Sequence, residues 1–299
     1  MKILNETRIP GGYLRRTRGV VLAACLLLTP AAVLAADPGP RGGAALTIED
    51  EPRPLAAAID HLQEQTGVVI TYEDAPYTFE GDLADVTESV RKDLDQYARG
   101  TAPRVMIPRP GSLWVALPET LGADDVPGLL EALLESHDRA GNAGRFRYEG
   151  QGDLYHVVPI STRGRDASWG EVGALLDTPV TLPEAERSVM ETLRDTLAAV
   201  HQQTGAKLSF GLIPRRLAVG VTLVTGATDE PARDVLVRTL ESTGLPLSWR
   251  LFYDPSMDGY FFNLSPVRPV EAVNPLEKAA GDGAGEGGIR LKGGDSGVR

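Results

Sequence analysis

The feature that most constrains the fold is an internal repeat, in which the same elements follow one another in the same order. A helix-like run ending in "EQTG" at Gly67 returns as one ending in "QQTG" at Gly205, an offset of 138. "GADDVP" at Gly122–Pro127 matches "GATDEP" at Gly226–Pro231, an offset of 104. The offset falls by 34, close to the length of the proline-rich stretch 74–111, so one insertion reconciles both matches.

Each copy predicts strand, helix, two strands, helix and two strands. In the first helix Leu55, Ile59 and Leu62 recur at helical spacing, Pro54 is well placed as the first helical residue, and Gly67 suits a left-handed cap. The first copy is expected to form strands at 45–50, 68–72, 112–117, 145–149 and 154–160, with its second helix at 124–137. The second copy is expected to form strands at 178–182, 206–210, 217–224, 246–253 and 259–265, with helices at 188–205 and 229–243.

These elements predict an α+β fold with two repeated small modules, each a mixed sheet covered by two helices. The pattern leaves open whether the helices are buried within each module or between the modules. Within the insertion 74–111, apolar residues at helical spacing predict an amphipathic helix over 82–98.

The expected domain organisation divides the chain into six segments. These are a signal peptide (1–35), a spacer (36–45), the first module (46–160), a linker (161–177), the second module (178–270) and a disordered glycine-rich tail (271–299).

The leader is typical of export. Basic residues at 15–18 precede an apolar run at 19–35, and we expect cleavage after Ala35 and a periplasmic or secreted protein. Two alternatives stay open: "LAAC" before Cys25 resembles a lipoprotein cleavage box, and an uncleaved leader would be a short membrane anchor. Membrane association is expected only through such a leader or a lipidated Cys25.

Charge and cysteine content exclude several classes of protein. The formal net charge is -11, and removal of the leader, with five Lys or Arg and one Glu, makes it 25 minus 40, or -15. An acidic chain is poorly suited to sequence-independent binding of nucleic acid or anionic lipid. Because Cys25 is the sole cysteine and lies in the leader, the mature chain has no disulfide and no cysteine metal site.

The second copy resembles a known family. Its "L-x3-L-x2-V-x3-TG" helix (Leu193–Gly205), valine-rich segment (Leu217–Val224) and "LESTGLP" helix end within Asp229–Tyr260 are similar to the secretin and TonB short N-terminal domain. The first copy matches less closely, because it carries the insertion and "SHDRAGNAG" replaces "STGLP". The resemblance implies a periplasmic protein–protein interaction module, found in secretion pores and in TonB-dependent receptors. In the proteins that it resembles, such modules accompany a secretin pore region or a receptor β-barrel. Here the second copy is followed only by a glycine-rich tail, so the resemblance implies that the partner is another polypeptide of the envelope.

The sequence presents no recognisable catalytic motif. Its four histidines have no metal-binding spacing, and acidic pairs such as Asp124–Asp125 begin helices, where carboxylates are favoured. We therefore assign no catalytic, cofactor-binding or metal residue and expect no cofactor. The aromatic residues of the predicted strands favour core packing, with a ligand-binding strip as the alternative (Trp114, Trp249, Phe252, Tyr253, Tyr260, Phe261 and Phe262).

The sequence therefore predicts an exported, non-enzymatic adaptor, associated with an outer-membrane secretion or TonB-dependent system. Two alternatives remain: a glycan- or peptidoglycan-binding module, and a hydrolase with a carboxylate site between the modules. The hydrolase would place Glu49 or Asp50 near Asp229.

Overall fold

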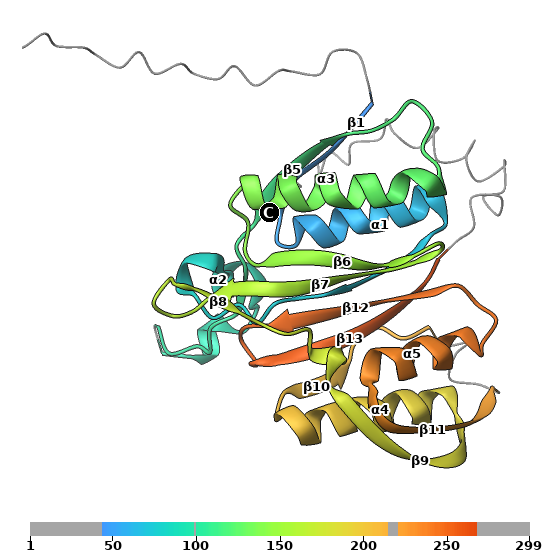
Figure 1. Cartoon of the computed structure of the whole chain (residues 1–299). Coiled ribbons are helices and arrows are strands. Elements are labelled where there is room, and N and C mark those ends of the chain that lie inside the picture. Colours follow the sequence, from blue (N-terminus) through green and yellow to red (C-terminus); the bar gives the residue numbers. More distant parts are fainter. Residues whose placement is uncertain (1–43, 99, 215–220, 268–299) are drawn as a thin grey trace, which may run out of the picture. The chain divides into compact units, whose positions relative to one another are not determined.

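The chain forms an α+β fold, which confirms the α+β part of the predicted fold class; strands from both predicted modules belong to one shared mixed sheet. The computed structural model describes residues 44–98, 100–214 and 221–267. In these residues, five α-helices accompany one mixed seven-stranded sheet and several two-stranded sheets (Figure 1). The predicted signal peptide (1–35) and the predicted tail (271–299) lie outside the described residues.

The first half of the fold spans residues 45–163. Its two-stranded sheet pairs β1 with β5 in antiparallel fashion, while β2 pairs with β7 in parallel and β7 pairs with β6 in antiparallel fashion. The elements are β1 (Ala45–Glu51), α1 (Pro54–Thr66), β2 (Val69–Glu73), β5 (Gly111–Ala116), α3 (Val126–Arg139), β6 (Arg145–Gln151) and β7 (Leu154–Arg163).

The second half spans residues 179–266 and pairs its strands in the same pattern. Strand β9 pairs with β11 in antiparallel fashion, β10 with β13 in parallel, and β13 with β12 in antiparallel fashion. The elements are β9 (Pro179–Ser188), α4 (Val189–Thr204), β10 (Lys207–Phe210), β11 (Thr222–Pro231), α5 (Ala232–Glu241), β12 (Leu247–Asp254) and β13 (Gly259–Pro266). A parallel β12–β2 pair joins the halves into one sheet, in the order β10-β13-β12-β2-β7-β6.

Local sequence signals explain where the first helix of each half begins and ends. Pro54 begins α1, and Gly67 ends it at φ 72° with its N–H bonded to the Gln63 carbonyl. In α4, Ser188 and Glu191 form a capping box, and Gly205 takes the same left-handed conformation. The predicted first residue and cap of α1 are therefore confirmed.

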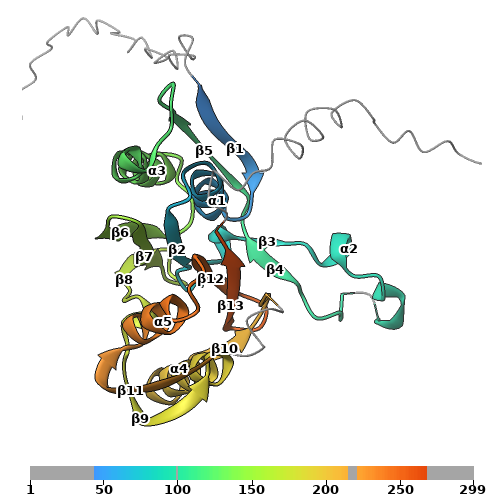
Figure 2. The ribbon, with the colours of Figure 1, turned by 90° about the vertical axis from the view of Figure 1, so that its right-hand side faces the viewer.

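The helices of the two halves lie on opposite faces of the sheet (Figures 1 and 2). Alternate residues of a strand point to opposite faces. Ile70 and Tyr72 of β2 accordingly pack in the core that contains α1 and α3, whereas Trp249 and Leu251 of β12 pack in the core that contains α4 and α5. Each half thus buries its own pair of helices.

The helix predicted over 82–98 is wrong. The structure has β3 (Leu83–Asp85) paired with β4 (Met106–Pro108), with only a short α2 (Thr87–Val90) and a 3-10 turn (Leu94–Gln96) between them. The side chain of Val90 is 53% exposed, so the apolar period of this segment has no core to face. A helix needs such a buried face to persist in water.

Two further segments differ from expectation. The predicted linker 161–177 contains the end of β7, a short strand β8 (Trp169–Glu171) paired with β7, and a 3-10 turn (Leu175–Asp177). The helix expected from Asp229 begins at Ala232, because β11 continues to Pro231. Of the strand predicted over 217–224, residues 217–220 lie outside the described part.

Candidate functional site

The acids named for a hydrolase are not brought together. Glu49 and Asp50 lie on β1, which pairs with β5, whereas Asp229 lies on β11, which pairs with β9. Figures 1 and 2 show these two-stranded sheets on opposite sides of the seven-stranded sheet. Among the described residues, no group of three or more His, Cys, Asp or Glu could hold a metal ion.

The structure instead gathers buried charges where β2 meets β12, a junction that we call the seam. Strand β2 ends in Glu73, and Asp74 follows at once; each residue is only 1% exposed. Each acid pairs with a different arginine, Glu73 with Arg233 and Asp74 with Arg53. A buried charge is costly unless it is paired and hydrogen-bonded, so the partners of these acids decide their role.

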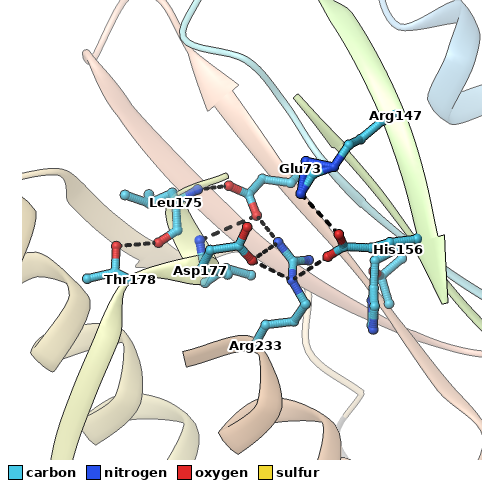
Figure 3. A network of polar contacts seen from close by, with 10 residues as sticks. Glu73, Arg147, His156, Leu175, Asp177, Thr178 and Arg233 are labelled. Atoms are coloured by element: carbon cyan, nitrogen blue, oxygen red, sulfur yellow. Dashed lines mark hydrogen bonds and ion pairs between the residues drawn. The ribbon is translucent and has the colours of Figure 1, made fainter. Parts of the chain in front are cut away.

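Glu73 is held by groups from the second half and from the segment before it. Its carboxylate accepts hydrogen bonds from Arg233 Nη2 at 3.3 Å, from the Leu176 N–H at 3.4 Å and from the Leu175 N–H (Figure 3). Burial raises the pKa of Glu73 to about 7, although Arg233 and the two N–H groups lower it. The desolvation cost of the ionised carboxylate is therefore larger than the stabilisation that Arg233 and the two N–H groups provide.

Arg233, in the first turn of α5, is the centre of the cluster. Its side chain is 4% exposed and lies 2.8 Å (Nη2 to Oδ1) from Asp177 and 3.8 Å (Nε to Oε1) from Glu149. Glu149 in turn pairs with Arg147 at 3.0 Å (Figure 3). One arginine of the second half is therefore surrounded by three carboxylates, two of them from the first half.

His156 of β7 adjoins this cluster as a neutral group. Its Nδ1 lies 2.7 Å from Thr71 Oγ1, and its ring stacks on Trp249 with centroids 5.5 Å apart. Burial, and then the positive charge of Arg233, lower the pKa of His156 to about 4. The imidazole is therefore uncharged at neutral pH.

Asp74 forms a second network across the seam. Its Oδ2 accepts from Arg53 Nε at 2.7 Å and from the Tyr253 N–H at 3.0 Å, and its Oδ1 accepts from the hydroxyls of Tyr72 at 2.8 Å and Tyr77 at 3.0 Å. Arg53 also donates to the Tyr253 carbonyl at 2.7 Å. These bonds tie the end of β2 to the end of β12.

A third arginine crosses the seam in the other direction. Arg250 of β12 donates to Asp60 of α1 at 2.5 Å from Nη2, and to the Ile70 carbonyl at 2.6 Å from Nη1. Ser248 Oγ also donates to the Ile70 carbonyl, at 2.6 Å. Side chains thus replace part of the backbone ladder between β2 and β12.

An open pocket of about 260 Å³ lies near this part of the seam; we call it the seam pocket. Val69 and Leu154 line it from the first half, and Leu240, Leu247 and Trp249 line it from the second. None of the acids Glu73, Asp74 and Asp177 is among its lining residues. The buried charges and the pocket are therefore separate features of the same junction.

Sequence reasoning assigned no role to Glu73, Asp74 or Arg233. The available signal was the acidic pair directly after the β-branched run at 68–72, because carboxylates at the end of a buried strand require cations. The predicted packing of aromatic residues holds for most of them: Trp249, Tyr253, Tyr260 and Phe262 are buried. Trp114 is 44% exposed.

Comparison of the chain with protein-family models, with curated proteins and with solved structures finds no match. Its function must be inferred from its own residues.

Proposed function

We propose that the protein is an exported, non-enzymatic interaction protein of the cell envelope, formed by two diverged copies of a module resembling the secretin and TonB short N-terminal domain. The two halves have the same order of elements and the same strand pairings once 74–111 is set aside, which supports duplication. In this proposal the paired modules act as one docking body for another envelope protein.

One observation carries the non-enzymatic part of the proposal. The two buried carboxylates of the seam are bonded to arginines and backbone N–H groups of the protein itself. A catalytic acid or base must reach a substrate, whereas Glu73 and Asp74 are each 1% exposed. In this proposal, these charges hold the two modules together. As a separate finding, none of the helices in the described residues has the length and hydrophobicity of a membrane-spanning helix.

A hydrolase is the second candidate, and one observation favours it. The pKa of Glu73, about 7, is in the range that suits a general acid at neutral pH. Because Glu73 is buried, a hydrolase that uses it requires the structure to open so that a substrate reaches its carboxyl group. The variant Glu73→Gln separates the two candidates, because it abolishes a hydrolase and leaves an adaptor able to bind.

The experiment is site-specific photo-crosslinking in living cells of the source organism. A photoreactive phenylalanine analogue replaces exposed apolar residues on separate surfaces, Trp114, Leu245 and Met257, and exposed Glu241 beside Leu245. The proposal expects one discrete adduct with an envelope protein, confined to one of these surfaces and still formed when Glu73 is replaced by Gln. Absence of adducts at every position, or an adduct lost with Glu73→Gln, contradicts it.

A further inference from the structure

The seam pocket is associated with the irregular pairing between β2 and β12. The ladder contains only the pairs Arg250–Tyr72 and Leu251–Glu73. Before these pairs, the Ile70 carbonyl accepts from the side chains of Ser248 and Arg250 instead of a backbone N–H of β12. Where side chains replace the ladder, Val69 and Leu247, the first residues of the two strands, become walls of the pocket.

The size and lining of the pocket suit side chains better than a whole cofactor. Its volume of about 260 Å³ is below the roughly 300–1,000 Å³ typical of small-molecule sites. Its walls are mainly aliphatic, with Leu240 and Leu247 buried and Val237 half-buried. A bulky apolar side chain would exchange water for these aliphatic contacts.

Trp249 forms a buried part of the pocket wall. Its side chain lines the pocket and is 1% exposed, and its Nε1 is buried without a hydrogen-bond partner among the described residues. A buried indole N–H usually has an acceptor. Because this nitrogen has almost no accessible surface, Trp249 contributes apolar surface to the pocket wall rather than a donor for a ligand.

The rim of the pocket carries negative charge. Asp153 and Glu241 are exposed lining residues, and no lysine or arginine lines the pocket. Leu245, also on the rim, is 49% exposed. An apolar hollow beside two carboxylates is complementary to a segment in which an apolar side chain lies next to a cation.

We propose that the seam pocket binds an extended segment of a partner protein in which a bulky apolar side chain is flanked by lysine or arginine. The apolar side chain packs against Val69, Leu240 and Leu247, and the flanking cations face Asp153 and Glu241. This inference rests on the proposed function, because it names the chemistry of the partner that the two modules bind.

The test is calorimetric titration of the full chain from Ala36 with the peptide acetyl-Ala-Lys-Leu-Arg-Ala-amide. A second peptide has glutamate in place of both cations. We expect the basic peptide to bind at least tenfold more tightly than the acidic one, with affinity falling as salt is added. The protein variant Glu241→Lys should reduce this preference about tenfold.

A matched pair of variants tests the location. Leu245→Glu alters the rim, whereas Leu212→Glu makes the same change at a 78% exposed leucine outside the pocket. The first should weaken binding of an acetyl-Ala-Leu-Leu-Leu-Ala-amide peptide about tenfold and the second should not. Both positions are on the surface, so unchanged circular dichroism should accompany both variants.

Several results overturn the proposal. One is equal binding of the basic and acidic peptides, and another is equal loss with Leu245→Glu and Leu212→Glu. The chain's own Ile289–Lys292, "IRLK", has the same alternation of apolar and basic residues. If the basic peptide binds only to a Leu291→Asp variant of the chain, the pocket receives the chain's own segment rather than a partner.

The two proposals fail in different ways. Peptide binding at the seam pocket without any adduct in cells supports the pocket and contradicts the adaptor function. An adduct at Met257 or Trp114, with no peptide binding, supports the adaptor function and overturns the pocket as the docking site.

Discussion

Glu73 and His156 lie in one buried cluster, and their opposite pKa shifts give a quantitative prediction. The pKa of Glu73 is about 7 in the folded protein, against an ordinary value of 4.5. Its contribution to stability is therefore present below pH 4.5 and is lost as the pH rises to 7. At 1.36 kcal/mol per pKa unit, the loss between pH 5 and pH 8 is about 2–3 kcal/mol.

His156 acts in the other direction. Its pKa is about 4 in the folded protein, against 6.5. Because the folded state disfavours the protonated imidazole, its contribution is present above pH 6.5 and is lost as the pH falls through 4. Between pH 5 and pH 8 the gain is about 2 kcal/mol, so the two groups nearly cancel in the native protein.

Replacing either group should reveal the pH dependence of stability that the other group contributes. With Glu73→Gln, we expect the free energy of unfolding to rise by about 2–3 kcal/mol more than that of the parent between pH 5 and pH 8. With His156→Gln, we expect it to fall by about 2 kcal/mol relative to the parent over the same interval. All other titrating groups are common to the three proteins, so their contributions drop out of the comparison.

The assay is urea-induced unfolding followed by circular dichroism at pH 5, 6.5 and 8. Each variant is compared with the parent at the same pH, which separates the pH dependence from any constant loss of stability. If both variants follow the parent within about 0.5 kcal/mol at every pH, then neither group titrates as its buried environment requires, and the reasoning is refuted.

Three further predictions concern the free energy of urea unfolding at pH 7. Arg233→Met should cost about 1–3 kcal/mol, because Glu73 and Asp177 lose a hydrogen-bonded cation and Glu73 then takes up a proton instead of remaining a buried charge; an unchanged midpoint would contradict the pairing. Asp74→Asn should cost about 3 kcal/mol because Arg53 loses its charged acceptor, and an unchanged midpoint would be evidence against that network. Gly67→Ala should destabilise by about 1 kcal/mol because φ is 72°, whereas Gly128→Ala, within α3 and in open space, should stabilise by up to about 1 kcal/mol; equal signs would disprove this account.

The elements that the sequence predicts well are those with strong local signals. Pro54 and Gly67 mark both ends of α1, and Gly205 marks the end of α4. The strands predicted at 145–149 and 154–160 are present as β6 and β7, and a turn at residues 152–153 separates them. In each case the backbone conformation depends on residues only a few positions apart.

The features that the sequence failed to predict depend on distant partners. The period of Val86, Val90 and Leu94 resembles that of a helix, but only tertiary structure decides whether a core lies beneath it. The pairing of Glu73 with Arg233 joins residues 160 positions apart, and no local pattern distinguishes Arg233 from other helix arginines. Likewise, apolar periodicity gave no indication that β12 would pair with β2.

The separation of these partners along the chain has a consequence for how the protein acquires its structure. Glu73 and Asp74 are synthesised early, but their contacts with Arg233 and the Tyr253 N–H span 160 and 179 positions. Contacts between such distant residues are slow to form, because the intervening chain must first be ordered. Strand β2 therefore cannot reach its final environment until nearly all of the second half has been made. We expect the two halves to gain and lose their structure together, as one cooperative unit rather than as two successive ones.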